Sequence, residues 1–444
     1  SDMAGNLKWA RLIAGGDWLG LHPWHPYHGW MQPIAPISQW IEWWGGELVF
    51  QQAPLYPYWL AGMLTFIRGH FDWIRIVQHG IGIGSGIILY LAAKKLMGSS
   101  GAFFAGLLGM LYFPFVCYEY FFLRDFLAVH FLCWIILWVV VSRQNSGFIP
   151  AFLAGLFLGF GILTRENFLI LAPFLFLFLQ PSSRGFSLKK TASSLAGMLL
   201  ALAPLFIRNG LCGLPVLSLS NRLIESLIEG NAFDSTPCYM CLPDSMGHYL
   251  KEGRGDFFRT LWLIISGYPD RFGFVIRQIQ KILCLFDFLE PYNNLNLYYF
   301  LKTFSWLNVL PNYPHLFLLA VPGFLYVIRG GKHLFLAKLF LLLTLSLILA
   351  PVLARYRLVL IPFYCLWGGL TVSLVLKKIH PAIGRILIAL FLLLPWTGYL
   401  INKTIPDRFK ERDTESTVFA IIQKSLESTT EKKGGGSLKL RIEN

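Results

Sequence analysis

The chain has 444 residues, of which 55% are apolar and 14% charged, and its mean hydropathy is +0.55. This composition excludes a disordered protein and an ordinary water-soluble domain. On a soluble chain the formal net charge of +14 would point to nucleic acid or another acidic partner. Here the apolar residues occur in long uninterrupted runs, so the charge has to be interpreted through membrane topology.

Residues 1–75 precede the first predicted span and contain nine of the 15 tryptophans. One interpretation is an interfacial aromatic belt with short helices lying on the membrane. The other is a groove whose aromatic faces stack on sugar rings or prenyl chains. The charges of the connections between the spans, described below, predict that this segment lies outside the membrane. Either the chain therefore starts outside or a further helix precedes it.

Three histidines of this segment, His22, His25 and His28, are spaced three residues apart. Pro23 and Pro26 prevent a regular helix between them, so the spacing does not place the three imidazoles on one face. Substrate hydrogen bonding or a rigid extended loop is therefore favoured over a metal site.

Ten stretches without Asp, Glu, Lys or Arg predict membrane spans. They are 76–93, 96–118, 126–142, 144–164, 167–183, 191–207, 303–328, 339–354, 358–376 and 386–402. The predicted fold class is therefore an all-α polytopic membrane protein.

The connections between these spans alternate in charge. One set holds 12 basic residues and no acidic one: Lys94, Lys95, Arg143, Arg184, Lys189, Lys190, Arg329, Lys332, Lys338, Lys377, Lys378 and Arg385. Short basic loops stay cytoplasmic, so the other side, which takes all 24 acids, is predicted to be outside. Most of the net charge thus reflects topology and gives no support to a nucleic-acid partner.

This topology divides the chain into five parts. They are a first outer loop (1–75), a transmembrane module (76–207), a long outer loop (208–302), C-terminal transmembrane helices (303–402) and a polar outer tail (403–444). In the long loop, residues 257–267 and 272–286 are amphipathic and are expected to lie along the outer leaflet. Cys238 and Cys241 form a C-x-x-C with Cys212 nearby in the sequence, and a structural disulfide is favoured there over a metal or redox site.

Charged residues also occur in very short outer turns, where the topology does not need them. These are Glu119, Arg124 and Asp125 in one turn, Arg165 and Glu166 in the next, and Arg355 and Arg357 in a third. Arginine can hold a phosphate through two parallel hydrogen bonds, so the group predicts an anionic lipid head group or a leaving phosphate. The alternatives are snorkelling to lipid phosphates and structural salt bridges from Arg124 or Arg165 to Asp125 and Glu166.

Five segments together resemble the membrane glycosyltransferases that use polyprenyl-phosphate sugars, a group that includes protein O-mannosyltransferases and the lipid A aminoarabinose transferase. The segments are 2–20 (DMAGNLKWARLIAGGDWLG), 50–57 (FQQAPLYP), 123–125 (LRD), 163–166 (LTRE) and 355–357 (RYR). The resemblance extends well to about residue 210 and is loose beyond it. It implies a GT-C-type bundle of about ten to eleven transmembrane helices, with surface helices on the outer face.

The resemblance also implies roles for individual residues. Asp2 would be the base that activates the acceptor, and Asp125 the second catalytic acid. Arg124, Arg165, Arg355 and Arg357 would bind the donor phosphate, and Glu166, His25, His28, Gln52, Pro54 and Tyr56 would line the substrate cavity. The sequence departs from the family pattern in two respects. The membrane helix that precedes the catalytic Asp in the family is absent here. The usual acidic pair is represented by Asp2 alone, between Ser1 and Met3. Asp17 is the alternative base.

The predicted reaction is an inverting single displacement, in which a monosaccharide leaves a polyprenyl-phosphate donor for a glycan, lipid or protein acceptor. The expected location is the bacterial inner membrane, with the site facing the periplasm. A divalent cation, Mg²⁺ or Mn²⁺, bridging Asp2, Asp125 and the phosphate is left open. A transporter or flippase is the alternative from another class, but transporters place ionisable groups near the midplane. A glycan ligase with a pyrophosphate-linked lipid donor would differ only in its donor.

Overall fold

The computed structural model describes residues 2–378 except Trp24, Pro26, His28, Trp30, 68–69, Ser146, 181–185, 239–241, Arg271, Leu289, 291–294 and 331–332. The predicted span 386–402 and the tail 403–444 lie outside the described residues, as do His28 and Cys241.

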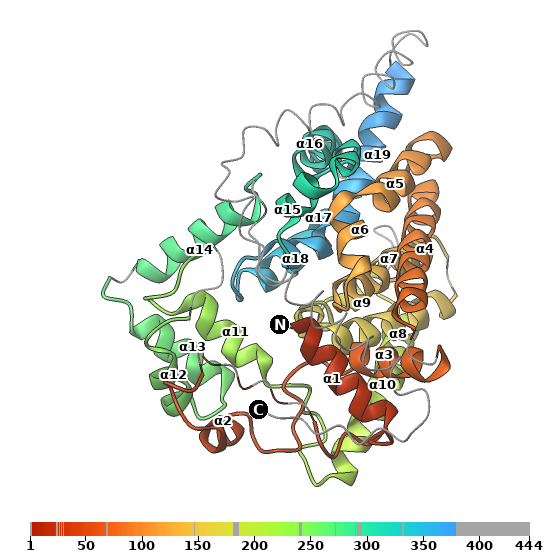
Figure 1. The fold of residues 1–444 in the computed structure, drawn as a ribbon. Helices are drawn as coiled ribbons and strands as arrows, with labels where there is room; N and C mark the ends of the chain where they lie inside the picture. The colour runs from red at the N-terminus through yellow and green to blue at the C-terminus, as the bar shows by residue number, and fades with distance from the viewer. Residues whose placement is uncertain are drawn as a thin grey trace.

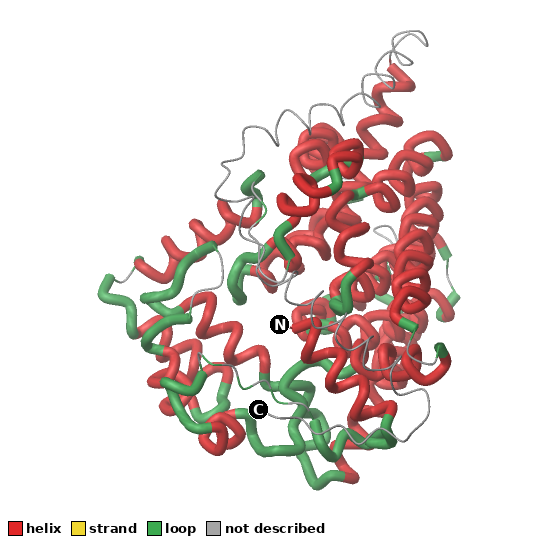
Figure 2. The backbone as a smooth tube through the Cα atoms, viewed as in Figure 1, coloured by secondary structure: helices red, strands yellow, loops and turns green. Residues whose placement is uncertain are grey.

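The described residues form helices and no strands (Figures 1 and 2). The α-helices are α1 Asp2–Ala14, α2 Ile37–Trp43, α3 Leu55–Phe66, α4 Phe71–Met97, α5 Ser99–Leu111, α6 Phe113–Tyr120, α7 Asp125–Gln144, α8 Ile149–Thr164, α9 Leu175–Phe178, α10 Leu188–Leu211, α11 Arg222–Asn231, α12 Met246–Gly253, α13 Phe257–Ser266, α14 Gly273–Leu285, α15 Leu297–Thr303, α16 Tyr313–Gly330, α17 Leu334–Leu347, α18 Ala354–Arg357 and α19 Ile361–Lys378. Short 3₁₀ segments cover Glu166–Leu171, Ser305–Val309 and Leu358–Leu360.

Within the part of the chain that the structure describes, four segments are long and apolar enough to cross a membrane: Phe71–Met97, Asp125–Gln144, Leu188–Leu211 and Ala354–Lys377. They contain the predicted spans 76–93, 126–142, 191–207 and 358–376. Two bent pairs raise the number to six, namely α5 with α6, at an angle of 44°, and Trp306–Gly330 with α17, at 117°. The chain is thus a helical protein with apolar membrane-spanning helices, but the count of ten is not confirmed.

The predicted span 167–183 is wrong as a continuous helix. Its described part, 167–180, consists of a 3₁₀ segment, a turn, the four-residue α9 and two residues beyond it. Pro173 lies at this turn, and proline lacks the backbone N–H that a helix interior uses. Likewise 303–328 becomes helical throughout only from Tyr313. A run without charges shows that a segment tolerates apolar surroundings, not that it stays helical along its length.

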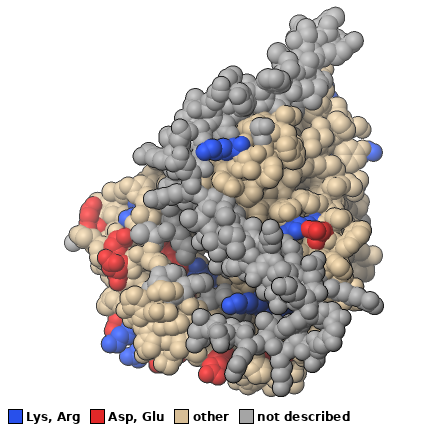
Figure 3. Space-filling view, in the orientation of Figure 1, with Lys and Arg blue, Asp and Glu red and all other residues tan. Residues whose placement is uncertain are grey.

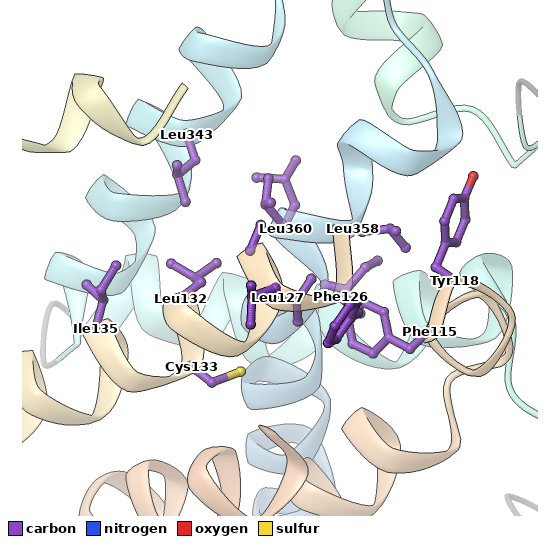
Figure 4. Close-up of a cluster of buried hydrophobic side chains, with 14 of the residues drawn as sticks. Phe115, Tyr118, Phe126, Leu127, Leu132, Cys133, Ile135, Leu343, Leu358 and Leu360 are labelled. Atoms are coloured by element: carbon purple, nitrogen blue, oxygen red, sulfur yellow. The ribbon is translucent and has the colours of Figure 1, made fainter. Parts of the chain in front are cut away.

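The main apolar core fixes the relative positions of α7 and the segment before α19. Figure 4 shows Leu127 and Leu132 of α7 beside Leu358 and Leu360, with Leu343 of α17 above them, and all five side chains are buried. The start of α7 and the short α18 are therefore held at the same end of the bundle.

Helices α8 and α10 pack backbone to backbone through glycines. A Cβ atom on Gly155 would lie 1.8 Å from the carbonyl oxygen of Ser194, and one on Gly197 would lie 2.1 Å from that of Phe152. Gly155 and Gly159 form the G-x-x-x-G spacing that lets membrane helices approach closely.

Gly155→Val is accordingly expected to destabilise the protein by about 1–3 kcal/mol or more, because the two helices must separate to admit the side chain. Thermal unfolding of the purified protein in detergent measures the change. Gly80→Ala, in the interior of α4, is the control, since nothing lies within 4 Å of its added Cβ. Equal melting temperatures for Gly155→Val and wild type would contradict the close packing.

The first loop and the long loop share a second apolar core. It joins Met31, Trp40 and Trp44 to Leu227 and Ile228 of α11. Figure 1 shows α2, α11, α12 and α13 grouped at the lower left, and most of the Asp and Glu visible in Figure 3 lie over this region. Two segments about 180 residues apart in the sequence thus fold together beside the bundle.

The two amphipathic stretches of the long loop form α13 and α14. Phe258 and Trp262 of α13, and Ile276 and Leu283 of α14, expose large apolar side chains. Exposed apolar faces of this kind are typical of helices that lie on a membrane surface.

The predicted disulfide is present at Cys238, but its partner is Cys284 of α14 rather than the nearby cysteine of the C-x-x-C. The bridge closes a separation of 46 residues, so it ties α14 to the loop before α12. Connectivity depends on which elements pack together, and short spacing in the sequence does not determine it.

Candidate active site

Asp2 is the first residue of α1, and its carboxylate forms an ion pair with Nη1 of Arg355 in α18. A carboxylate is favoured at a helix N-terminus by the helix dipole. The Arg355 side chain is 8% exposed and that of Asp2 is 32% exposed. Asp2 thus lies at the accessible edge of a buried arginine.

Asp125 is the first residue of α7 and forms an ion pair with Arg165, which directly follows α8. Helices α7 and α8 pack against each other as consecutive helices, so the start of one meets the end of the other. Both side chains are buried, at 1% exposed for Asp125 and 7% for Arg165. The competing prediction of a salt bridge from Arg165 is therefore confirmed for Asp125.

Tyr356 joins the two ion pairs into one cluster. Its ring centroid lies 4.6 Å from the guanidinium carbon of Arg165 and 5.1 Å from that of Arg355, both within cation–π range. The cluster therefore combines residues from the first loop, two membrane helices and the segment before α19.

Three arginines of this region have buried N–H groups without a hydrogen-bond partner among the described residues: Nη1 of Arg124, Nε of Arg165 and Nε of Arg355. The second carboxylate oxygen of Asp125 is also buried and has no hydrogen-bond partner among the described residues. Glu166 and Asp2 both act electrostatically on Arg124, which brings Arg124 into the charged neighbourhood. Buried donors of this kind suit an anionic ligand, and the planar guanidinium suits a phosphate.

Arg357 is engaged elsewhere. Its Nη1 donates to the carbonyl oxygens of Leu285, at 3.3 Å, and Asp287, at 2.6 Å, and its guanidinium carbon lies 3.5 Å from the ring centroid of Tyr313. It also forms an ion pair with Glu290. The structure thus separates Arg357 from Arg355, and Arg357 holds the end of the long loop.

Glu166 accepts a hydrogen bond from the Ser220 hydroxyl, in the loop that leads into α11. Tyr56 is fully buried and donates to Oε1 of Gln78 at 2.9 Å, and Asp125 acts on it electrostatically. Of the other predicted cavity residues, Pro54 lies at the N-cap of α3 and Gln52 is half-buried before it.

His25 belongs to the first loop's own packing. Its Nε2 lies 2.7 Å from the Glu47 carbonyl oxygen, and its ring stacks on Trp44 with centroids 5.2 Å apart. Burial lowers the pKa of His25, while Glu47 opposes this. Within the described part of the chain, no three His, Cys, Asp or Glu side chains gather as a metal site would require.

The charged residues of α11 form a network that was not predicted from the sequence. Nη1 of Arg222 pairs with Glu225, and Nη2 donates to both carboxylate oxygens of Glu229 at 3.1 Å. Asp2 acts electrostatically on Arg222 and on Glu229. The sequence pattern that could have indicated this network is the spacing of positions 222, 225 and 229, which places the three side chains on one helical face.

An all-helical chain with apolar spanning helices and a cluster of carboxylates and arginines at helix ends fits the GT-C class of membrane glycosyltransferases at a coarse level. Residues 51–207, about a third of the chain, match the family described as dolichyl-phosphate-mannose-protein mannosyltransferase. The resemblance predicted from the sequence is thereby confirmed over these residues, and the match indicates a glycosyltransferase. No curated protein matches the chain.

Proposed function

We propose that this protein transfers a monosaccharide from a polyprenyl-phosphate donor to an acceptor at the outer surface of the bacterial inner membrane. The observation that supports this most is that the guanidinium groups of Arg165 and Arg355 lie at one tyrosine ring. Each of these arginines also holds a carboxylate from a distant part of the chain, that of Asp125 or Asp2. The matched family's name specifies a dolichyl-phosphate mannose donor and a protein acceptor, which supports keeping a protein among the three candidate acceptors.

The reaction is a single displacement at the anomeric carbon. The Asp2 carboxylate takes the proton of the acceptor hydroxyl as the acceptor oxygen forms its bond to that carbon. The bond between the carbon and the phosphate oxygen breaks, and its electron pair leaves with the polyprenyl phosphate. Attack from the face opposite the phosphate inverts the configuration.

The arginines stabilise the charge of the leaving phosphate. Arg124, Arg165 and Arg355 would each contribute on the order of 2–4 kcal/mol where that charge develops. Because Arg355 pairs with Asp2, a phosphate that binds Arg355 frees the Asp2 carboxylate to act as a base. Asp125, which is more deeply buried, serves as the residue that orients Arg165.

The orientation in the membrane follows from the two ends of the same helices. Lys94 and Lys95 occupy the last turn of α4, Arg143 that of α7, and Lys190 the first turn of α10. Asp125 is at the opposite end of α7. By the positive-inside rule, these positions support an orientation with the basic ends in the cytoplasm and the charged cluster in the periplasm. The proposal also includes the predicted GT-C bundle of about ten to eleven transmembrane helices and the division of the chain into the five predicted parts.

The test incubates purified protein with short-chain polyprenyl-phosphate monosaccharides and measures released polyprenyl phosphate and glycosylated acceptor. Turnover with at least one monosaccharide donor is expected. A pyrophosphate-linked glycan donor forms the second arm, and turnover with this donor alone would establish the ligase instead. Absence of release with every monosaccharide donor would contradict the proposal.

A further inference from the structure

Helix α11 presents two different faces to its surroundings. Leu227 and Ile228 are fully buried in the second apolar core, whereas Arg222, Glu225 and Glu229 form a network of ion pairs. In Figure 1, α11 lies between the outer helices at the lower left and the N-terminal end of α1. The helix is therefore anchored on one side and charged on the side that Asp2 influences.

The charged face of α11 is tightly held. Glu225 accepts hydrogen bonds from Nε1 of Trp44 and from Nε2 of Gln51, the latter at 3.1 Å. The side chains of Glu225 and Glu229 are 2% and 1% exposed, and that of Arg222 is 17% exposed. Arg222 is thus the more accessible member of the network, and the two carboxylates fix its position.

Arg222 lies within electrostatic range of the proposed donor site. Asp2 and Tyr356 both act on its guanidinium. Burial alone would lower the pKa of Arg222, but Glu229 and Glu225 outweigh it and raise the pKa. The guanidinium therefore stays charged, and its Nη1 and Nη2 donate to Glu225 and Glu229.

The region around Asp2 carries an excess of one negative charge, so binding of a further anion requires compensation. Five carboxylates belong to it, those of Asp2, Asp125, Glu166, Glu225 and Glu229, against four guanidinium groups, those of Arg124, Arg165, Arg222 and Arg355. A polyprenyl-phosphate sugar is a phosphodiester with one negative charge, which would double the excess. Uptake of a proton by one carboxylate returns the excess to one negative charge.

Glu229 is the carboxylate best suited to take up that proton. Burial raises its pKa to about 7; Arg222 opposes the shift, and Glu225 and Asp2 add to it. Lys281 of α14 lies at the end of α11, where it donates to the Gly230 carbonyl oxygen at 3.0 Å. Burial lowers the pKa of Lys281 to about 7, and Arg277 adds to this shift.

We propose that Arg222 is a further ligand of the donor phosphate, and that Glu229 holds Arg222 in position and takes up a proton from solvent when the donor binds. The inference rests on the proposed function and assigns to the long loop a part in donor recognition. Protonation weakens the ion pair between Glu229 and Arg222, and the guanidinium then donates hydrogen bonds to the phosphate. Glu229 is in this sense a positioning residue, because it acts through Arg222.

The experiment measures binding of the methyl ester of a short-chain polyprenyl phosphate between pH 5.5 and 8.5. This probe is a phosphodiester like the donor, so its own charge does not change across the range. For wild type the Kd is expected to rise by up to about tenfold per pH unit above about pH 7, as binding linked to one proton requires. Calorimetry in two buffers of different ionisation enthalpy should detect proton uptake near pH 7.5.

Glu229→Gln is expected to flatten this pH dependence and to abolish the proton uptake. Arg222→Gln should weaken binding by about 10–100-fold, and Arg222→Lys should weaken it with little change in melting temperature, because lysine keeps the charge but loses the planar fork. Glu252→Gln on α12 and Arg259→Gln on α13 are the matched controls and should behave as wild type.

The outcomes separate the two proposals. If wild type neither binds the probe nor turns over any monosaccharide donor, the proposed function fails. If wild type is active but Glu229→Gln keeps the wild-type pH dependence, or both Arg222 variants bind as wild type, the inference about α11 is wrong and the proposed function stands.

Discussion

Asp2→Asn is expected to lower turnover by about 10²–10⁴-fold, the usual contribution of a positioned general base. Asparagine has nearly the same shape as aspartate but cannot take the proton of the acceptor hydroxyl. Release of polyprenyl phosphate under saturating donor measures kcat, and the donor concentration series gives KM. Because the variant removes the ion pair with Arg355, donor KM should stay within a few-fold of wild type or fall.

Two further variants test the assignment of the base. Asp72→Asn is the matched control, since its carboxylate is 87% exposed and pairs with Arg75 at the start of α4. Asp17→Asn tests the alternative base; Asp17 accepts hydrogen bonds from the backbone N–H groups of Leu21 and His22, which indicates a role in closing a turn. Unchanged kcat in Asp2→Asn, or a loss confined to Asp17→Asn, would show that Asp2 is not the base.

Asp125→Leu is expected to destabilise the protein by about 3–5 kcal/mol, because it leaves the buried Arg165 without its counter-charge. The double variant Asp125→Leu/Arg165→Met should recover a large part of this loss, since an apolar pair can replace a buried ion pair at little cost. Thermal and denaturant unfolding in detergent measure both, and a double-mutant cycle gives the coupling energy.

The pair of Asp72 and Arg75, in which the arginine is buried and the carboxylate is exposed, provides the comparison for this cycle. Its carboxylate is largely in contact with solvent, so its coupling should be about 0–1 kcal/mol. If the coupling energy of Asp125 and Arg165 is no larger than that of Asp72 and Arg75, the prediction that the buried pair is strongly coupled is wrong. Turnover is expected to remain low in the double variant even where stability recovers, because Arg165 is proposed to bind the phosphate.

The membrane class and four of the spans could be predicted from the sequence because hydropathy is a local property. A stretch such as 126–142 is apolar whatever it packs against, and it lies within the helix Asp125–Gln144. Asp125, Arg165 and Arg355 could be selected for a similar reason, since charges in short turns between apolar runs are visible without a fold, whereas Asp2 was selected through the family resemblance.

The pairing of these residues was decided by the tertiary structure. Asp2 meets a residue 353 positions away. Arg355 and Arg357 are only two positions apart yet have separate partners, because Arg355 meets Asp2 of α1 and Arg357 meets Glu290 of the long loop. The network of α11 and the bridge from Cys238 to Cys284 likewise depend on which elements of the long loop pack together. Hydropathy and motif spacing are fixed along the chain, whereas ion pairs and disulfides require two distant segments to meet, and only packing of the helices determines which segments do.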